Sequence, residues 1–276
     1  MVSNLTLLAC FVTLFVSLLL PVIAISVLSY QNKGGKVISA WVLGAAGFIV
    51  TQLLIRLPIL TALQSQPWFL SFSENYGFLY AFSLAFTAGL FELAGRFVVA
   101  KPMQKNLNYN RALAAGLGHG GIEAMILIGI TYLNNILYIL MINNGTFDAV
   151  VSEAVTAGVD VSALLLVKEQ LLQASPALFL LAGFERILAM TGHVAMSLMV
   201  CYGVYTRKPL KAALICLGIH TLMDLTAGIS LLIGKGLSQT AAYVIIYAIL
   251  VVMAVLSILI IRKINRQWKE TEDDYV

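Results

Sequence analysis

The sequence predicts an all-α polytopic membrane protein: a bundle of seven transmembrane helices with its N-terminus outside and its C-terminus in the cytoplasm. Of its 276 residues, 60% are hydrophobic and 11% are charged, whereas a soluble domain carries about 25% charged residues. The hydrophobic residues form long uninterrupted stretches, and most of the lysines and arginines lie between those stretches. This pattern excludes a soluble domain of ordinary size, so we expect the protein to act inside the lipid bilayer.

Seven apolar stretches are long enough to cross the hydrocarbon core, which takes about 20 helical residues. They cover residues 4–29, 37–63, 77–100, 111–142, 176–205, 210–233 and 239–262. No cationic residue precedes the first stretch, and it is too long for the apolar core of a signal peptide, so we expect a retained helix. The chain shows no tandem repeat and no linker, and we expect residues 1–276 to form a single membrane domain.

The orientation follows from the cations in the connections, because cytoplasmic loops are enriched in lysine and arginine. One set of alternate loops, with the C-terminal tail, holds twelve cations: Lys33, Lys36, Lys101, Lys105, Arg111, Arg207, Lys208, Lys211, Arg262, Lys263, Arg266 and Lys269. The opposite side holds Lys168 and Lys235. This asymmetry predicts a cytoplasmic C-terminus. It also explains the net charge of +4 through topology, so no nucleic-acid partner is expected.

Residues 143–175 form a connection that is too long for a turn and too polar to span the membrane. Apolar residues recur in it at helical spacing, which predicts one or two short amphipathic helices on the outer face. Such helices either cap the bundle or act as a lid over a substrate site.

Ten ionisable side chains remain inside the spans after the loop cations are set aside. An unpaired charge at the bilayer centre costs about 3 kcal/mol, so these groups must point inward and find partners, and they mark a functional site by default. They are Arg56, Arg96, Arg186, Glu92, Glu123, Glu185, Asp224, His119, His193 and His220. We expect Arg56 to be an ion-pair partner or a helix-end group, and Glu185 to be structural.

Helical spacing arranges these groups. Side chains four residues apart share a helix face. The pairs with this spacing are Glu92 with Arg96, His119 with Glu123, and His220 with Asp224, while Arg186 and His193 share a face seven residues apart. At a rise of about 1.5 Å per residue from the cytoplasmic cations, six groups fall within a layer about 10 Å thick. These six are Glu92, His119, Glu123, His193, His220 and Asp224, and we expect them to meet in one polar pocket below the inner headgroups.

The glycines around His119 indicate close helix packing at this pocket. Gly116 and Gly120 form a GxxxG pattern, and Gly118 and Gly121 lie beside His119. Small residues of this kind let the backbone of a neighbouring helix approach closely. We therefore expect the helix that carries His119 to contact its neighbours through this stretch.

Carboxylates and histidines in one pocket indicate activation of water for hydrolysis. A carboxylate can act as a general base, and a histidine can protonate a leaving amine or stabilise an oxyanion. The HExxH zinc pattern is absent, because the sequence from His119 reads HGGIE, and a second membrane aspartate and a GxSG serine are also missing. We therefore expect no cofactor. Zinc is the alternative, held by His119, His193, His220 and Glu92.

The order of these motifs resembles the YhfC family of membrane peptidases. The resemblance runs from Gly89 to Asp224 and rests on four pieces: Glu92xxxArg96, GxGHGGxE ending at Glu123, Glu185-Arg186 with His193 seven residues after Arg186, and His220xxxAsp224. That family is related to PrsW and to the CPBP group, which includes the CAAX-processing proteases, together described as glutamic-type intramembrane proteases.

The resemblance implies a role for each matching residue. Glu92 is similar to the glutamate that activates water, with His193 assisting, and Arg96 would hold Glu92 in place. His220 with Asp224 is similar to the pair that stabilises the oxyanion. The relatives often have two consecutive glutamates where this chain has Glu92 followed by Leu93, so Glu92 and Glu123 are both candidates for the base.

These observations predict an intramembrane endopeptidase of the glutamic type in the cell membrane. Its catalytic residues are expected to be Glu92, Glu123, His193 and His220, with Arg96, His119, Arg186 and Asp224 in support. Its substrate would be a membrane protein or a membrane-associated peptide. The alternatives are a proton- or ion-coupled transporter, whose relays use the same residue types, and a non-catalytic binding or immunity protein of the same fold.

Overall fold

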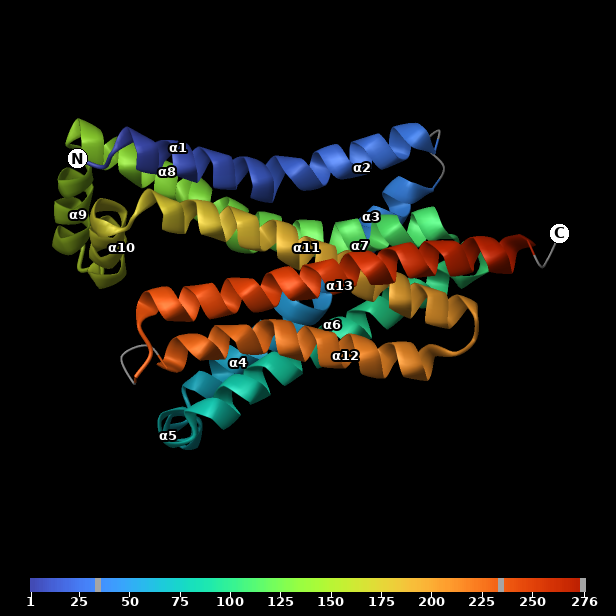
Figure 1. Cartoon of the computed structure of the whole chain (residues 1–276). Coiled ribbons are helices and arrows are strands. Elements are labelled where there is room, and N and C mark those ends of the chain that lie inside the picture. The colour runs from blue at the N-terminus through green and yellow to red at the C-terminus, as the bar shows by residue number, and fades with distance from the viewer. Residues whose placement is uncertain (33–35, 233–235, 274–276) are drawn as a thin grey trace. The chain divides into compact units, whose positions relative to one another are not determined.

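A computed structural model describes residues 1–32, 36–232 and 236–273, and this part of the chain is almost entirely helical (Figure 1). It contains seven helical segments that are long and apolar enough to cross a membrane: Asn4–Gln31, Val37–Gln64, Gly77–Asn106, Tyr109–Asn144, Pro176–Tyr205, Pro209–Ser230 and Gln239–Thr271. The predicted seven-helix, all-α class is thus confirmed. The expected end of the sixth span at residue 233 and the loop cations Lys33 and Lys235 lie outside the described residues, and the orientation of the termini stays a prediction.

The chain divides into two compact units. The first consists of Met1–Pro21 and Glu123–Ile187, and the second of Val22–Ile122 and Leu188–Val276. Three of the membrane spans contribute residues to both units, because the boundaries fall inside helices. The single-domain expectation stays a prediction.

The first unit is built around α1 (Asn4–Leu14) and α8 (Ile130–Asn144), which pack along each other (Figure 1). Two π-helical segments, η1 (Phe15–Leu19) and η4 (Ala124–Gly129), continue the contact. The unit also includes the first part of α11 (Pro176–Tyr205). Its core contains the fully buried side chains of Cys10 and Ile139.

The polar connection folds into two short helices of the first unit, α9 (Phe147–Thr156) and α10 (Ser162–Gln173). Two short helices are present, and each buries one large apolar side chain, since Phe147 and Leu171 are both 2% exposed. The amphipathic character expected of this segment stays a prediction. The outer location of the two helices and their role as a cap or a lid stay predictions.

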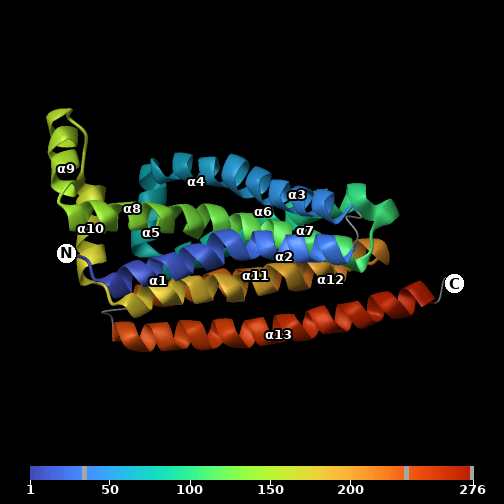
Figure 2. The ribbon, with the colours of Figure 1, turned by 90° about the horizontal axis from the view of Figure 1, so that it is seen from above.

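The second unit holds the remaining helices and the larger core. Its elements are most of α2 (Leu20–Gln31), α3 (Val37–Phe48), η2 (Ile49–Arg56), α4 (Leu57–Gln64), α5 (Pro67–Asn75), α6 (Gly77–Met103), η3 (Gln104–Asn106), α7 (Tyr109–Glu123), the rest of α11, α12 (Pro209–Leu225), η5 (Thr226–Leu232) and α13 (Gln239–Asp273). Helix α6 packs along α12, α3 and η2. The long helix α13 (red in Figures 1 and 2) contributes the fully buried Trp268, which stacks on Tyr205.

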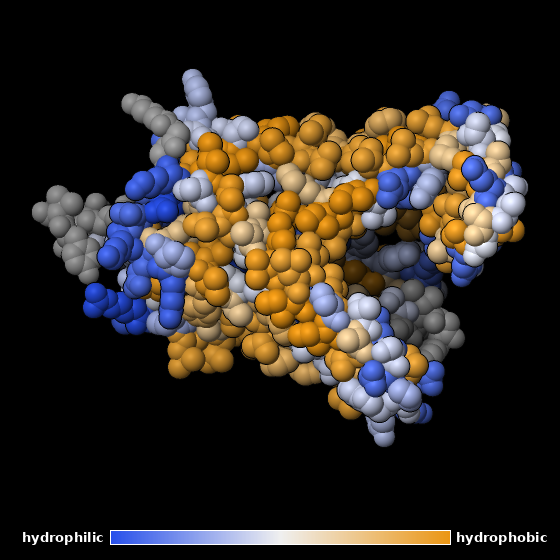
Figure 3. Space-filling model, turned by 180° about the vertical axis from the view of Figure 1, so that it is seen from behind, coloured by the Kyte–Doolittle hydropathy of each residue, from blue (hydrophilic) through white to orange (hydrophobic). Residues whose placement is uncertain are grey.

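On the face shown in Figure 3, hydrophilic side chains cluster at the left and at the right of the view, and apolar side chains lie between them. The exposed Lys101 and Lys105 lie in the last turn of α6 and in η3, after the apolar stretch of this span.

Glycines bring the backbones of α3 and α7 into direct contact within the second unit. A Cβ atom on Gly118 would lie 2.0 Å from the carbonyl oxygen of Trp41, and one on Gly44 would lie 2.0 Å from that of Ala115. Gly120 faces the Cβ of His193 on α11 in the same way, at 2.9 Å. The interpretation of the glycines around His119 as packing residues is confirmed, and this packing draws three helices together at His119.

These contacts predict opposite outcomes for two glycine substitutions. Gly118→Ala should destabilise the protein by about 1–3 kcal/mol, because its methyl group overlaps a backbone that cannot move freely. Gly218→Ala is the matched control, since nothing lies within 4 Å of that position in α12, and it should be neutral or stabilising by about 0.5–1 kcal/mol. Thermal unfolding in detergent measures both, and equal midpoints for the two variants would contradict the packing.

Candidate metal centre

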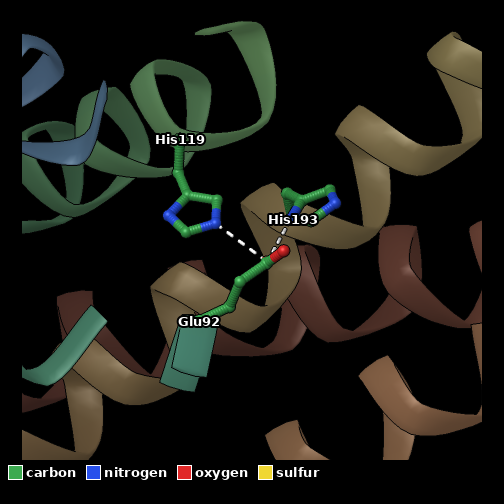
Figure 4. Close-up of side chains that lie close together, drawn as sticks. All are labelled: Glu92, His119 and His193. Atoms are coloured by element: carbon green, nitrogen blue, oxygen red, sulfur yellow. Dashed lines mark hydrogen bonds and ion pairs between the residues drawn. The ribbon is translucent and has the colours of Figure 1, made fainter. Parts of the chain in front are cut away.

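Four helices of the second unit bring four buried side chains to one point: Glu92 from α6, His119 from α7, His193 from α11 and His220 from α12. All four are at most 4% exposed. The three imidazoles surround a single carboxylate oxygen, Oε2 of Glu92. His220 Nε2 lies 2.7 Å from it, His119 Nε2 2.9 Å and His193 Nδ1 3.5 Å. Figure 4 shows Glu92, His119 and His193 converging in this way.

The convergence follows from local structure. Glycines on α7 let α11 approach, so that the rings of His119 and His193 stack with their centres 5.4 Å apart. The ring of Phe48, at the end of α3, meets that of His119 edge-on at 5.5 Å. His119 therefore packs against a neighbour on α3 as well as on α11, which fixes the direction in which its Nε2 points.

Arg96 supplies the compensating positive charge. Its Nη2 lies 3.2 Å from Glu92 Oε2, which confirms the ion pair expected from their spacing on α6. The same Nη2 lies 2.7 Å from His193 Nδ1. Because a guanidinium can only donate hydrogen bonds, Nδ1 must be the unprotonated nitrogen of His193. The lone pair of Nδ1 accepts this hydrogen bond and is therefore directed at Arg96 Nη2, which lies beside the carboxylate.

Gln52 is a site residue that the sequence analysis missed. Its Nε2 donates to Glu92 Oε1 at 2.8 Å and to the carbonyl oxygen of Ala88 at 3.2 Å, and its Oε1 accepts from Arg56 Nη1 at 3.2 Å. Arg56 can only donate, so it fixes the orientation of the Gln52 amide. The signal that could have revealed Gln52 is its spacing from Arg56, four residues along one helix, but glutamine carries no charge and so is not among the ionisable residues that need partners in a membrane span.

The segment that carries Gln52 is π-helical, from Ile49 to Arg56. A π-helical turn shifts the register of the side chains and is frequent at functional sites. Here the segment packs against α6, and the buried Gln52, which is 5% exposed, contacts Glu92. Arg56 thus orients Gln52, and it also donates to Thr87 and to the carbonyl oxygen of Leu84. Its expected role as an ion-pair partner or a helix-end group stays a prediction.

His220 connects the buried cluster to a more exposed carboxylate. Its Nδ1 lies 3.5 Å from Asp224 Oδ2, one helical turn further along α12, while its Nε2 faces Glu92. The Asp224 side chain is 40% exposed. The imidazole of His220 therefore lies between two carboxylates, one buried and one open.

Glu123 and Arg186 belong to a separate cluster in the first unit. Arg186 Nη1 donates to Glu123 Oε1 at 3.1 Å, and its Nε and Nη2 donate to the two carboxylate oxygens of Glu185, the former at 2.6 Å. Arg186 thus pairs with both carboxylates within that unit, which lowers the cost of placing these charges in apolar spans. The catalytic role expected for Glu123 and the supporting role expected for Arg186 stay predictions.

The residues of the second unit fit a divalent metal ion. One ligand atom from each of Glu92, His119 and His193 lies within 4.8 Å of the other two, and two imidazoles with one glutamate are a known ligand set of catalytic zinc. Bonds of about 2.1 Å in a tetrahedral site place ligand atoms about 3.4 Å apart, close to the 2.9 and 3.5 Å seen here. Arg96 Nη2 also shows that a cation is accommodated between His193 and Glu92.

A metal on His193 Nδ1 requires the Arg96 guanidinium to move away from that nitrogen. Within the described part of the chain, Arg96 Nε and Nη1 have no hydrogen-bond partner, although both are buried. A void of about 10 Å³, lined in part by Arg96 and Ser197, lies on this side of the cluster. The guanidinium of Arg96 therefore borders a void of about 10 Å³ and is not held in place by hydrogen bonds from Nε or Nη1 to the described residues.

Comparison with known proteins gives two matches. Residues 16–251 match the family model described as YhfC intramembrane metalloprotease. The chain is 35% identical over 180 residues to the membrane protein YhfC of Bacillus subtilis (strain 168), a region that covers 65% of this chain and 66% of the relative, just under two thirds of its length. No solved structure matches the chain significantly.

The expectation that the protein needs no cofactor is wrong. The matching family is described as a metalloprotease, and Glu92, His119 and His193 form a group that could hold the ion. A metal was disfavoured because a zinc motif on a single helix is missing, and zinc held by His119, His193, His220 and Glu92 was the alternative. Here the three candidate ligands come from three different helices, so no short motif could reveal them.

The contacts of Gln52 predict its effect on metal affinity. Gln52→Leu removes the donor that holds Glu92 Oε1, and loss of such an outer partner typically weakens metal binding about 10–100-fold. Thr51→Val is the matched control, because Thr51 is also buried but its hydroxyl donates to Gly47 of its own helix. Competition with a chelator in detergent measures the zinc affinity of each variant. Equal affinities for the two would show that Gln52 does not position Glu92.

Proposed function

Because the chain belongs to the YhfC family, which is described as intramembrane metalloproteases, we propose that it is a metal-dependent endopeptidase of the cell membrane. Its substrate is a peptide bond of a membrane protein or a membrane-associated peptide. The observation that carries the proposal is the meeting of three imidazoles at one buried carboxylate oxygen, inside helices that are long enough to span a bilayer.

In this proposal, Glu92, His119 and His193 hold the metal ion. A bound zinc ion supplies Lewis-acid polarisation of the scissile carbonyl and makes water a nucleophile near neutral pH. Gln52 and Arg96 then act as positioning residues. Gln52 fixes Oε1 of Glu92, so that Oε2 faces the imidazoles, and Arg96 balances the negative charge of the carboxylate.

His220 is the residue that we assign to proton transfer. Hydrolysis of a peptide bond needs a proton taken from the attacking water and a proton given to the nitrogen of the leaving amine. His220 Nε2 is directed at the centre of the cluster, and Asp224 lies at its other nitrogen. Nε2 donates to Glu92 Oε2 here, so it would accept the proton when Glu92 serves as a metal ligand and this hydrogen bond is released, and the negative charge of Asp224, 3.5 Å from Nδ1, would stabilise the imidazolium that forms.

This assignment replaces the metal-free glutamic mechanism, since Glu92 is used as a ligand. It also differs from the two alternatives raised by the sequence. A transporter or a non-catalytic protein of the same fold needs no arrangement of metal ligands beside a histidine–aspartate pair. Metal content and peptide cleavage separate the three functions.

The ligand assignment predicts the metal content of three variants. Purified wild-type protein should contain about one zinc ion per chain, and His119→Ala and His193→Ala should each lose most of it, since catalytic zinc uses three protein ligands. His220→Ala should keep its zinc. Elemental analysis of the detergent-solubilised proteins gives the ratio of zinc to protein. If wild-type protein is stripped of metal, incubated with zinc and still binds none, the ligand assignment is wrong.

The role of His220 predicts a loss of cleavage without loss of metal. His220→Ala should lower the rate about 10²–10⁴-fold, the usual contribution of general acid–base catalysis. Asp224→Asn should show a smaller loss, because it leaves His220 in place. The assay uses proteoliposomes that contain a mixture of single-span membrane peptides, with new termini detected by mass spectrometry. Full activity of His220→Ala would assign the proton transfer to another group.

A further inference from the structure

A cavity of about 280 Å³ adjoins the histidine cluster in the second unit. Its wall includes Ala81, Ala85 and Ala88 of α6, together with Arg56, Asp224 and Gly228. It touches the cluster at two places. The carbonyl oxygen of Ala88 accepts from the Gln52 amide that holds Glu92, and Asp224 lies against His220.

The cavity lies on one defined side of the cluster. In α6 its residues precede Glu92, whereas Lys101 follows Glu92, and Ala88 lies about 20 Å from Lys101 at 1.5 Å per residue. In α12 and η5 its residues follow His220, whereas Lys211 precedes it. Both α6 and α12 therefore place the cavity on the side of the cluster away from the cations Lys101 and Lys211.

The side of the cluster that faces Lys101 is tightly packed. Among the described residues, Val99 and Cys201 border a void of about 10 Å³ there, and the cavity of about 770 Å³ between α2 and α3, lined by Ile38 and Trp41, has no residue of the cluster in its wall. Ala100 is fully buried, and the glycine contacts between α3 and α7 leave no space between their backbones. A peptide cannot reach the metal ligands from this side without separating packed helices.

The cavity continues toward a polar end of the unit. A second cavity of about 550 Å³ shares Ala81 and Gly228 with it and is lined at its far end by Glu74 and Asn75, where α5 ends. The two cavities together extend from Glu74 and Asn75 to Asp224, which lies 3.5 Å from the buried His220. Asp224 is therefore the point at which this cavity system comes closest to the cluster.

We propose that the substrate enters through this cavity, from the membrane side opposite the Lys101 end of α6, as an extended peptide segment with small side chains. The proposal rests on the proposed peptidase function and adds the entry side and the conformation of the substrate. The sequence alone led to a pocket below the inner headgroups. The cavity instead directs entry from the opposite side, which the loop charges identify as the outer one.

The chemistry of the cavity wall suits an unwound peptide. A segment that leaves its helix for cleavage exposes backbone N–H and C=O groups, and these need partners inside a membrane. Asp224, whose side chain is 40% exposed, offers acceptor oxygens on this wall, while Arg56 donates to Gln52, Thr87 and the carbonyl oxygen of Leu84 and contributes its positive charge. The rest of the wall is formed by Tyr80 and Leu84 beside the alanines and Gly228, and the volume of about 280 Å³ limits the bulk of the segment that it can hold.

Cysteine labelling tests the entry side. Ala81→Cys and Ala85→Cys are placed in a chain whose native cysteines, all buried, are replaced by alanine. A membrane-impermeant, charged methanethiosulfonate reagent is applied to each face of sealed vesicles, because it reacts with a thiolate in water and not with a thiol in lipid. Lys105→Cys, on an exposed residue after α6, marks the opposite side of the membrane.

Two matched controls lie on the same helix. Phe82→Cys has the depth of Ala81→Cys, but the 41% exposed Phe82 is not part of the cavity wall. Ala100→Cys lies in the packed region on the Lys101 side. We expect Ala81→Cys to react at least tenfold faster than either control, and from the face opposite to that at which Lys105→Cys reacts. Labelling no faster than Phe82→Cys, or from the Lys105 face, would overturn the proposal.

A second measurement separates this proposal from the peptidase function. Labelled Ala81→Cys should keep its zinc but lose cleavage in the proteoliposome assay, because the bound reagent blocks the path of the substrate. Undiminished cleavage after complete labelling would exclude the cavity as the entry path. If no variant, labelled or unlabelled, binds zinc or cleaves peptides, the peptidase function fails while the labelling still reports whether the cavity opens to water.

Discussion

The second unit is organised around one buried carboxylate, that of Glu92. An ionised group in a membrane span is costly unless it is paired and hydrogen-bonded, and Glu92 is 4% exposed. Its Oε1 accepts from Gln52, and its Oε2 is reached by Arg96 and by the imidazoles of His119 and His220. These partners come from α6, η2, α7 and α12, so satisfying one carboxylate fixes how these elements meet.

The glycines and the π-helical segment explain how so many partners can reach one group. Contact of α3 with α7 at Gly44 and Gly118, and of α7 with α11 at Gly120, brings the helix backbones together without intervening side chains. The segment from Ile49 to Arg56 directs Gln52 toward Glu92, and Arg56 fixes its amide. Tight packing on one side of the cluster and a cavity on the other follow from the same arrangement, which gives the site a closed face and an open face.

The sequence predicted which residues form the cluster, but it favoured a site without the metal ion that they fit. Helical spacing and depth brought Glu92, His119, His193 and His220 into one layer, and the structure joins them at one oxygen. The absence of a metal was inferred from missing local motifs, and this failed because the candidate ligands are spread over three helices. Glu123 has the right depth, yet it pairs with Arg186 in the first unit, because depth says nothing about the direction in which a side chain points.

The sequence by itself determined the seven apolar spans, the alternation of charge between loops, the short helices between residues 147 and 173, and the ionisable residues that needed partners inside the membrane. These features depend on composition and on the 3.6-residue period, which are local properties of the chain. Only the tertiary structure decided which partners these residues have, the contribution of Gln52 and the side on which the cavity lies. Those depend on how helices distant in sequence rotate and approach one another, and close packing of side chains and glycines fixes that only once the helices are assembled.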